Sequence, residues 1–528
     1  MPDFFTGAQA AELIPDGATV LIDGSGGGVN DPDLFLRQIE QRFLTEGAPR
    51  ELTVVHVSGM GDADGGGIDR LAHEGLVRRV IGGHWAWSPR MQRLAVDERI
   101  EAYCLPQGTL SHLLRAIAAG GPGVISQVGL GTTVDPRQEG GRLNASAQEP
   151  LVELIELAGR EWLFTKAFPI DVAIVRGSQA DELGNVSMAD EGLLAETLSA
   201  AQAARNSGGL VIAQVRERVP AMSLPPRSVR VPGVLVDVVV EEPEQRLSSI
   251  TRDSRFLTGQ LRVAGSTARP MPFGVRKVIA RRAAQELCVG NVVNLGFGMP
   301  DGVSAVLAEE GLANQVVLTV EQGHVGGMPV GGSDFGMALN PWATLDAGHQ
   351  FDWYDGGGLD VAVLSFAQVD SDGNVNVGRF NNRISGVGGF INISQGARRV
   401  VFVGTVAVGA DISVDGTGGV AILAEGKPKF VDKVEQISFS GRRALETYQE
   451  VLYVTERGVF QLQPDGLYLV EIAPGLDVER DLAPIVGAKF HVAEDLRLMD
   501  SAYYRAAPLD WPSLATTQYR TSGPGRQS

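Results

Sequence analysis

The sequence predicts an α/β protein made of two similar domains with mainly parallel sheets, and four observations support this fold class. The chain has 528 residues, which is long for one hydrophobic core and enough for two or three domains. Val/Ile/Leu-rich runs alternate with segments of helical periodicity, as in parallel sheets covered by helices. One stretch of the first half is also echoed in the second. The 67 glycines, many in short clusters, suit the tight strand-to-helix turns of such a fold.

The clearest echo pairs residues 171–186 with residues 360–375. In both stretches an apolar run predicts a buried strand, and an Asp followed by Gly-Asn predicts a turn into a second short strand. Recurrent strands alone do not explain why polar turn residues coincide as well. They match at a constant offset: Gln179 with Gln368, Asp181 with Asp370, and Gly184-Asn185 with Gly373-Asn374.

A second echo is weaker. Residues 19–26 and residues 291–298 both read as a strand ending in glycines, and helical patterns follow each, from Pro32 through Phe43 and up to Leu307. Any α/β protein repeats strand, glycine and helix, so this pair alone decides little. The two echoes together predict one domain at residues 1–263 and a second at residues 274–528, joined by a stretch that includes Pro270 and Pro272.

The net charge of −18 argues against nucleic acid as a partner, because neutralising phosphates requires a basic surface. An anionic ligand is still possible, since a few local cations or backbone N–H groups can hold a phosphate. Two distant cysteines, Cys104 and Cys288, make a disulfide framework improbable and favour a reducing compartment. The first residues lack a signal-peptide pattern, and no run approaches the roughly 20 apolar residues of a membrane span. We expect a cytoplasmic protein without a membrane partner.

Three segments of the second half could carry chemistry. In residues 317–328 a β-branched run leads into Glu321, and glycines follow, so the carboxylate is expected at the carboxyl end of a strand, where open α/β sheets bind ligands. A solvated turn glutamate is the commoner explanation of that pattern alone. Residues 386–394 carry clustered glycines whose N–H groups could face an oxyanion or a phosphate, although a tight turn explains them equally. Residues 291–300 fit a strand-to-helix phosphate cradle, for which a lone Gly-x-Gly is weak evidence.

Other chemistries lack their motifs. The sequence has no CxxC pair and no HExxH, so a dedicated transition-metal site is not expected. His84 and His324 stand beside glycines without paired ligand spacing, and each is read mainly as a structural residue. The absence of GxSxG and GxxxxGK[ST] argues against a serine hydrolase and a nucleoside triphosphatase.

Taken together, the segments resemble a family I coenzyme A transferase of the propionate/acetate branch, in which both halves are fused into one chain. The resemblance runs from about Asp16 to Leu482 and rests on several long motifs in order. In the first half these are LAHEGLVRRVIGGHW (71–85), LPQGTLSHLLR (105–115) and VGLGTTVDPR (128–137), and in the second VEQG, GGSDFG, QFDWYDGGGLD, GNVNV and GVGGFINIS. It implies two α/β domains of the CoA-transferase type, also called NagB/RpiA-like, the first alpha-subunit-like and the second beta-subunit-like with the catalytic Glu.

The resemblance also implies roles for individual residues. Glu321 stands where the family has its nucleophile, and Gly388 and Gly389 stand where it has its oxyanion hole. Asn376, in the GNVN turn, is implied less securely as a helper. Coenzyme A is expected along two glycine turns, at Gly296, Phe297, Gly298 and Met299 and at Gly386, Val387 and Phe390.

The sequence departs from the branch beside the nucleophile, where Ser and Gly-Pro usually follow the Glu. Here Gln322-Gly323-His324 follows, and the glycine run 24–28 replaces a more apolar version. We therefore expect Gln322, His324, Gly26 and Gly27 to shape a substrate pocket that differs from that of the branch. The acids exchanged are left open for the same reason.

The implied reaction transfers coenzyme A between a short-chain acyl-CoA, of the acetyl or propionyl type, and a carboxylic acid acceptor, as in short-chain fatty acid metabolism. It is ping-pong and proceeds through a glutamyl-CoA thioester on Glu321, without a metal, because covalent catalysis divides one difficult exchange into easier steps. A homo-oligomer, dimer or tetramer, follows from the branch. Two alternatives stay open: an acyl-CoA hydrolase on the same scaffold, and a non-catalytic binding protein for acyl-CoA or a sugar phosphate.

Overall fold

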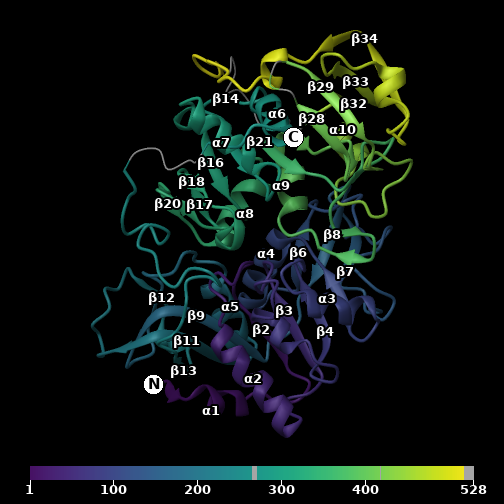
Figure 1. Ribbon diagram of the computed structural model, residues 1–528. Helices are drawn as coiled ribbons and strands as arrows, with labels where there is room; N and C mark the ends of the chain where they lie inside the picture. Colours follow the sequence, from purple (N-terminus) through teal and green to yellow (C-terminus); the bar gives the residue numbers. More distant parts are fainter. Residues whose placement is uncertain (265–269, 415, 417, 517–528) are drawn as a thin grey trace.

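Two large sheets, one from each half of the chain, form the two main bodies of the protein (Figure 1). The structure is a computed structural model and describes residues 1–264, 270–414, 416 and 418–516. Half of the predicted joining stretch, residues 265–269, lies outside the described residues. The N-terminus lies at the bottom of Figure 1, whereas the last described strand, β35 (Ala515–Thr516), pairs with β14 (Cys288–Val289) in the other body. We refer below to residues up to 263 as the N-terminal part and to residues from 274 as the C-terminal part.

The sheet of the N-terminal part runs in the order β1-β13-β11-β9-β2-β3-β4-β5, and all these neighbours are parallel. Its strands are largely apolar and buried, as expected for a sheet covered on both faces. A short antiparallel strand, β10, pairs with β9 and with β12. The bounds are β1 (Asp3–Phe5), β2 (Thr19–Ile22), β3 (Leu52–His56), β4 (Val77–Gly82), β5 (Glu101–Cys104), β9 (Val172–Asp181), β10 (Val186–Ser187), β11 (Leu210–Val219), β12 (Val229–Val231) and β13 (Val238–Glu241).

The sheet of the C-terminal part runs in the order β20-β17-β16-β15-β21-β26-β31-β32-β33-β34. Its centre, from β16 to β31, is parallel, and antiparallel strands extend it at both ends; the outermost strand β34 pairs parallel with β33. The bounds are β15 (Val292–Leu295), β16 (Val317–Val320), β17 (His324–Val325), β20 (Ala343–Thr344), β21 (Leu359–Ser365), β26 (Ala397–Val403), β31 (Glu450–Val454), β32 (Gly458–Gln463), β33 (Gly466–Ile472) and β34 (Phe490–Leu498). The two sheets confirm the predicted α/β class with mainly parallel strands.

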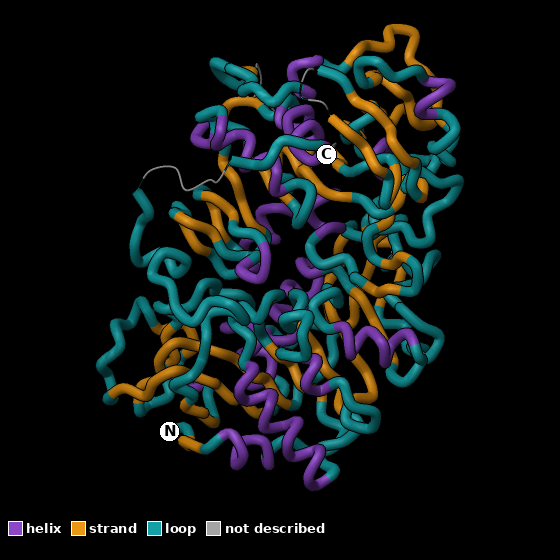
Figure 2. Tube along the Cα trace, in the orientation of Figure 1, coloured by secondary structure: helices purple, strands orange, loops and turns teal. Residues whose placement is uncertain are grey.

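Both parts also contain smaller sheets (Figure 2). One has three strands in the order β6-β8-β7, and the others are two-stranded. The bounds are β6 (Gly123–Ser126), β7 (Val152–Leu157), β8 (Arg160–Lys166), β14 (Cys288–Val289), β18 (Met328–Pro329), β19 (Ala338–Leu339), β22 (Gln368–Val369), β23 (Val375–Asn376), β24 (Arg379–Phe380), β25 (Arg383–Ile384), β27 (Ala407–Val408), β28 (Asp411–Val414), β29 (Val420–Ala424), β30 (Lys427–Pro428) and β35 (Ala515–Thr516).

Each part carries five α-helices among its described residues. Helix α4 of the N-terminal part packs against α5 and also against α8 and α9 of the C-terminal part, so it lies at the boundary between the two bodies. Described residues include no helix that is both long and apolar enough to cross a bilayer. The bounds are α1 (Gly7–Glu12), α2 (Asp33–Glu46), α3 (Pro89–Val96), α4 (Gln107–Ala118), α5 (Thr197–Asn206), α6 (Val275–Ala284), α7 (Asp301–Glu309), α8 (Ala347–Asp355), α9 (Phe390–Gly396) and α10 (Gly441–Glu446).

The segments that repeat in the sequence form equivalent strands in the two sheets. The order β13-β11-β9-β2-β3 corresponds to β31-β26-β21-β15-β16, and the matching Asp residues make matching contacts. Asp171 accepts a hydrogen bond from the Thr19 N–H at 2.8 Å, as Asp360 accepts one from the Val292 N–H at 2.9 Å. Asp181 and Asp370 each accept bonds from the backbone of the turn that follows and from its Asn side chain. The weaker strand–glycine–helix echo therefore reflects equivalent strands, β2 and β15.

The glycine segment of the C-terminal part is bound tightly to the N-terminal part. Residues 384–391 run along residues 83–85, where the Trp85 N–H donates to the Ser385 carbonyl at 2.7 Å. The apolar side chains of Ile384, Val387 and Ile391 belong to the hydrophobic core of the N-terminal part. The two cores are therefore not separated at one point of the chain, and the domain limits 1–263 and 274–528 stay a prediction.

Candidate active site

Glu321 follows the last residue of β16 directly, at the carboxyl end of the parallel strands. The strand exists because residues 317–320 are apolar or β-branched, and it ends in a tight turn that returns as β17. Gly323 in this turn has a φ of +119°, which a side chain would strain. The Glu321 side chain is directed inward, and the residue is 8% exposed. This is the position that the sequence pattern predicts.

A cavity of about 440 Å³ lies over Glu321, and both parts of the chain form its wall. The N-terminal part contributes loops after its strands, and the C-terminal part contributes the glycine turns and α9. Of the predicted site residues, those in the wall are Gly26, Gly296, Phe297, Glu321, Gln322, Gly386, Val387, Gly388, Gly389 and Phe390. Sequence reasoning missed the rest of the wall: Ser58, Gly59, Ala63, His84 as a lining residue, Ala86, Trp87, Gln107, Phe335, Leu364, Ser365, Val377, Ser385 and Ile393.

Burial shifts the pKa values of the titratable side chains that line this cavity. It raises the pKa of Glu321, although hydrogen bonds from its own backbone and from the Asn294 and Gln322 amides oppose that rise. Burial lowers the pKa of His84 to about 4, so the imidazole is neutral at pH 7. The described lining residues include neither Lys nor Arg. The site therefore presents one carboxylate in surroundings without a cation to hold it in place.

The two candidate oxyanion glycines differ in what their N–H groups do. The Gly388 N–H donates to the Gly83 carbonyl at 2.7 Å and is therefore occupied. The Gly389 N–H has no acceptor among the described residues, and a Cβ on Gly389 would lie 3.3 Å from Glu321 Cγ. The prediction of a pair of glycine donors is thus corrected to one available donor beside the carboxylate, at Gly389.

A second available donor comes from Gln107, which the sequence reasoning missed. Its backbone N–H donates to the Gly388 carbonyl at 2.9 Å, which fixes the residue against the glycine segment. The side chain is buried and lines the cavity, and its Nε2 has no hydrogen-bond partner among the described residues. The motif LPQG already marked this position, but nothing local shows that it meets a turn 281 residues later (388 − 107).

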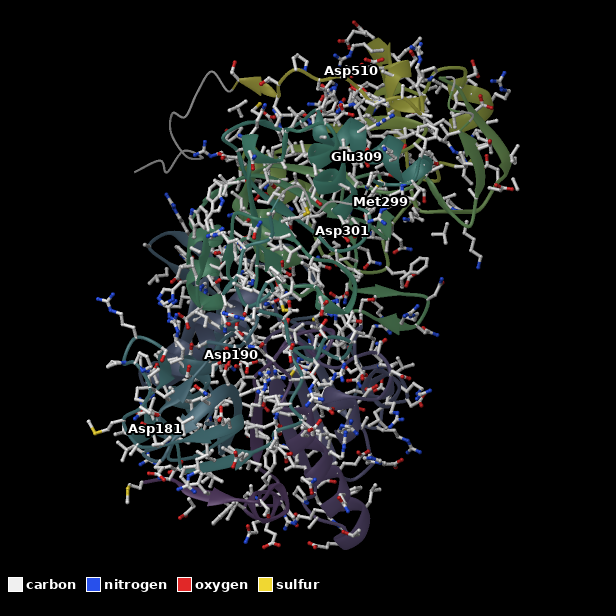
Figure 3. The ribbon with its side chains drawn as sticks, turned by 60° about the vertical axis from the view of Figure 1, so that its left-hand side comes forward. Asp181, Asp190, Met299, Asp301, Glu309 and Asp510 are labelled. Atoms are coloured by element: carbon white, nitrogen blue, oxygen red, sulfur yellow. The ribbon has the colours of Figure 1, made fainter. Side chains whose placement is uncertain are left out.

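Aromatic rings from both parts form one side of the cavity. Phe297 meets Trp87 with ring centroids 6.2 Å apart and Phe335 with centroids 5.1 Å apart, both edge to face. Gly26 is needed here because a Cβ would collide with the Trp87 indole. The next residues of the turn, Gly298 and Met299, do not line the cavity. They lead into α7, where Asp301 accepts a bond from the Gly298 N–H at 3.2 Å; Figure 3 labels Met299 and Asp301 at this helix start.

Three predicted site residues have structural contacts outside the cavity wall. The Asn376 amide donates to Gln368 at 2.7 Å and to the Arg379 carbonyl at 2.6 Å, so no donor is left for a substrate. His324 bridges the two parts, since its Nε2 lies 3.0 Å from the Gly192 carbonyl. A Cβ at Gly27 would collide with the Ser333 backbone. The structure therefore gives no support to a catalytic Asn376 or to pocket roles for His324 and Gly27.

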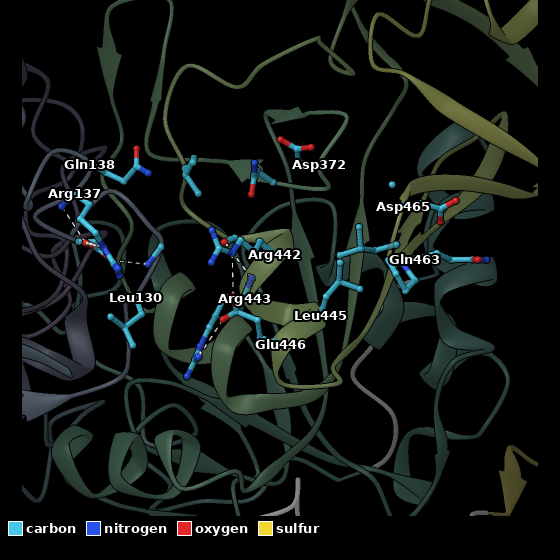
Figure 4. A pocket seen from close by; sticks show the side chains of 18 of the residues that line it. Leu130, Arg137, Gln138, Asp372, Arg442, Arg443, Leu445, Glu446, Gln463 and Asp465 are labelled. Atoms are coloured by element: carbon cyan, nitrogen blue, oxygen red, sulfur yellow. Dashed lines mark hydrogen bonds and ion pairs between the residues drawn. The ribbon is translucent and has the colours of Figure 1, made fainter. Parts of the chain in front are cut away.

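A larger groove of about 940 Å³ also lies between the parts, lined by residues of 130–161 and 372–466 (Figure 4). None of the predicted site residues lines it. Its arginines are paired with acids: Arg137 with Asp135 at 2.7 Å and Arg442 with Glu446 at 3.0 Å. Arg443 also lies 3.4 Å from Glu446, so the three arginines of the groove are all paired with acids of the protein.

Comparison with known proteins agrees with this geometry. The family model described as coenzyme A transferase matches residues 6–242. The chain is 42% identical to the acetate CoA-transferase YdiF of Escherichia coli K12 over 94% of each chain. It is also 42% identical to the caffeate CoA-transferase of Acetobacterium woodii, over 98% of this chain and 99% of that one. The structure of YdiF from E. coli O157:H7, in a thioester complex with CoA, superposes with a TM-score of 0.93, 40% identity and 98% coverage of both chains.

Proposed function

The chain belongs to the coenzyme A transferase family, and from this premise we propose that it exchanges coenzyme A between an acyl-CoA and a free carboxylic acid, with Glu321 as covalent relay. The observation that carries the proposal is the position of Glu321, buried in a cavity wall beside the unpaired Gly389 N–H. Membership makes the protein a CoA-transferase. The covalent route and the substrates are our inference.

The proposed route begins when a Glu321 carboxylate oxygen attacks the acyl carbonyl carbon of the thioester. The carbon–sulfur bond breaks, the thiolate leaves with its electron pair, and a mixed anhydride joins Glu321 to the acyl group. The thiolate then attacks the glutamyl carbonyl and displaces the first acid as its carboxylate, which leaves a glutamyl thioester. An acceptor carboxylate reverses both steps, so no thioester energy is lost to water.

Both steps pass through a tetrahedral oxyanion, for which the site supplies two candidate donors, the Gly389 N–H and Gln107 Nε2. The fold holds the backbone of both residues, and neither donor has another acceptor in the described part of the chain. A donor that needs no reorganisation stabilises such an intermediate by about 3 to 4 kcal/mol. The raised pKa of Glu321 also helps, because a more basic carboxylate is a better nucleophile once it is ionised.

Two features favour transfer over hydrolysis on the same scaffold. Glu321 and His84 are the titratable side chains of the described wall, and the His84 pKa of about 4 makes its imidazole a poor base for activating water. The Glu321 residue is only 8% exposed, so water has restricted access to an anhydride formed there.

The residues that line the cavity also limit which carboxylic acids can bind there. A second carboxylate would find no Lys or Arg among the described lining residues, so we propose monocarboxylic substrates. We propose short-chain donors such as acetyl-CoA or propionyl-CoA, and the acetate and caffeate CoA-transferases named above extend the candidate acids from small to ring-bearing ones.

The test is to mix the purified protein with acetyl-CoA alone and to measure its intact mass, followed by peptide mapping. We expect a mass gain of one coenzyme A joined with loss of water, located at Glu321. The Glu321→Gln variant should show no gain, whereas Glu196→Gln, which replaces a buried glutamate outside the cavity wall, should still form the adduct. No adduct together with steady release of coenzyme A would replace the transferase by a hydrolase.

A further inference from the structure

The start of helix α4 is held by the glycine segment of the C-terminal part. The helix begins after Pro106, whose side chain cannot accept a hydrogen bond, so its first N–H groups need acceptors from elsewhere. The Gln107 N–H donates to the Gly388 carbonyl at 2.9 Å. The Gly108 N–H donates to Oδ1 of Asn392 at 3.1 Å. With the first bond alone the helix start could pivot, and the second bond prevents this.

The amide of Asn392 can make its contacts in only one orientation. The residue lies on α9 and is fully buried, and its Nδ2 lies 2.9 and 3.0 Å from the two carboxylate oxygens of Asp355. The Gly108 N–H can only donate, so it requires the oxygen of the amide. An ionised carboxylate only accepts, so it requires the NH₂ group. The neighbours on both sides thus set the same orientation, and Asp355 anchors the amide.

Close packing surrounds this contact. A Cβ on Gly108 would collide with Asn392 Nδ2 and would lie 2.6 Å from Phe351 Cδ1. The same ring of Phe351 would lie 3.3 Å from a Cβ on Gly389, so one side chain of α8 lies close to both segments. Asp355 follows Phe351 by one helical turn. Helices α4, α8 and α9 therefore meet here, at the boundary between the two bodies (Figure 1).

We propose that Asn392 is a positioning residue for the transfer reaction. By holding the start of α4 against α9, it sets the distance between the two oxyanion donors, Gln107 Nε2 and the Gly389 N–H. Asp355 acts through Asn392, because it fixes the amide. Neither residue is among the described residues that line the cavity, so both act without touching the substrate. The inference rests on the proposed function, which assigns the two donors to the oxyanion.

The test removes the polar contact and then restores it in reverse. Asn392→Leu keeps the branched shape without the amide, and the rate of adduct formation from acetyl-CoA should fall roughly 10- to 100-fold, because a misplacement of about 1 Å can cost about 100-fold. Asn392→Asp combined with Asp355→Asn exchanges the two groups. This double variant keeps an acceptor for the Gly108 N–H and one donor–acceptor pair, so its rate should return to within about threefold of wild type.

A mutant cycle with Gln107→Ala separates positioning from a general loss of structure. In that background Asn392→Leu should lower the rate by no more than about threefold, because the donor that it positions is already gone. Arg115→Met is the matched control. It removes the contact of α4 to Asp352, at 2.6 Å, at the other end of the same helix, and its rate should stay at the wild-type value.

Urea unfolding establishes that each variant is folded, and Asp355→Leu takes the place of Asn392→Leu if the latter does not fold. An unchanged rate in Asn392→Leu, equal losses with and without the Gln107 side chain, or an exchange that recovers stability without the rate overturns the assignment. A wild type without an adduct refutes the Glu321 relay instead. The same variants are then compared by the rate of acetyl-CoA consumption in the presence of propionate, which does not depend on a covalent route.

Discussion

Gly389→Ala tests whether the glycine segment positions the nucleophile. The added methyl would lie 3.1 Å from Ile393 Cδ1, 3.3 Å from Glu321 Cγ and 3.3 Å from Phe351 Cζ, so these neighbours must give by a few tenths of an ångström. The backbone itself accepts Ala, because the φ of Gly389 is −79°. The substitution therefore acts on Glu321 without straining the chain.

The magnitude follows from the sensitivity of covalent catalysis to position. A misplacement of about 1 Å can cost about 100-fold, and a shift of a few tenths corresponds to roughly 3- to 10-fold. We expect the rate of adduct formation from acetyl-CoA to fall by this factor, as measured by quenched-flow mass spectrometry. Overpacking should lower the free energy of unfolding by about 1 kcal/mol or slightly more.

Gly388→Ala is the matched control. Its φ is +52°, which an alanine adopts at a cost of about 1 kcal/mol, and the nearest atom to its Cβ is His84 Cδ2 at 3.5 Å. It should lose similar stability but less adduct-forming rate. Equal rates for Gly389→Ala and wild type, or equal losses in both variants, would refute the reasoning.

Three further predictions concern charge and burial. The rate of adduct formation should rise with pH, because only the ionised form of Glu321 attacks. The apparent pKa of this rise should lie above about 4.3, the ordinary value for Glu, because burial raises the pKa of Glu321. A pH–rate profile measures it. Burial and the charge of Asp23 raise the pKa of Glu196, so the free energy of unfolding should fall as the pH rises from about 5 to 9. The midpoint of urea unfolding measures this fall, and it should depend less on pH in Glu196→Gln. His324→Leu should lose about 1 to 3 kcal/mol in denaturant unfolding, because the Gly192 carbonyl loses its partner, while the preference among acids stays unchanged.

The position of Glu321, the proposed nucleophile, was predictable from the sequence because its signal is local. An apolar β-branched run that meets a carboxylate and then glycines places Glu321 at the end of a parallel strand, and the topology agrees. The echoed stretches likewise carried their own turn chemistry, so Asp181 and Asp370 make the same contacts. The edge hairpins were also readable in principle: residues 464–465 are too few for a crossover, which forces β32 and β33 to be antiparallel.

The remaining part of the site depends on contacts between distant segments, which local patterns do not specify. Gln107 and Trp87 reach the cavity because the loops of the N-terminal part meet the C-terminal part, and their own neighbourhoods give no sign of it. The occupied N–H of Gly388 depends on Gly83, far away in the chain. Asn376 shows the converse limit of a motif, because its amide donates to Gln368 and to the Arg379 carbonyl, and its catalytic role stays a prediction.

The insertion of Ile384, Val387 and Ile391 into the core of the N-terminal part has a consequence for the newly made protein. Ribosomes complete the N-terminal part first, and domains generally fold in that order during synthesis. Glu321 emerges before the segment that carries Gly389, and that segment acquires its shape by docking on a surface that already exists. On the proposed mechanism, a nascent or truncated chain that ends before residue 384 bears the reactive carboxylate but lacks that donor. On that mechanism the chain can react with acyl-CoA thioesters only late in translation, so incomplete chains do not consume the thioesters of the cell.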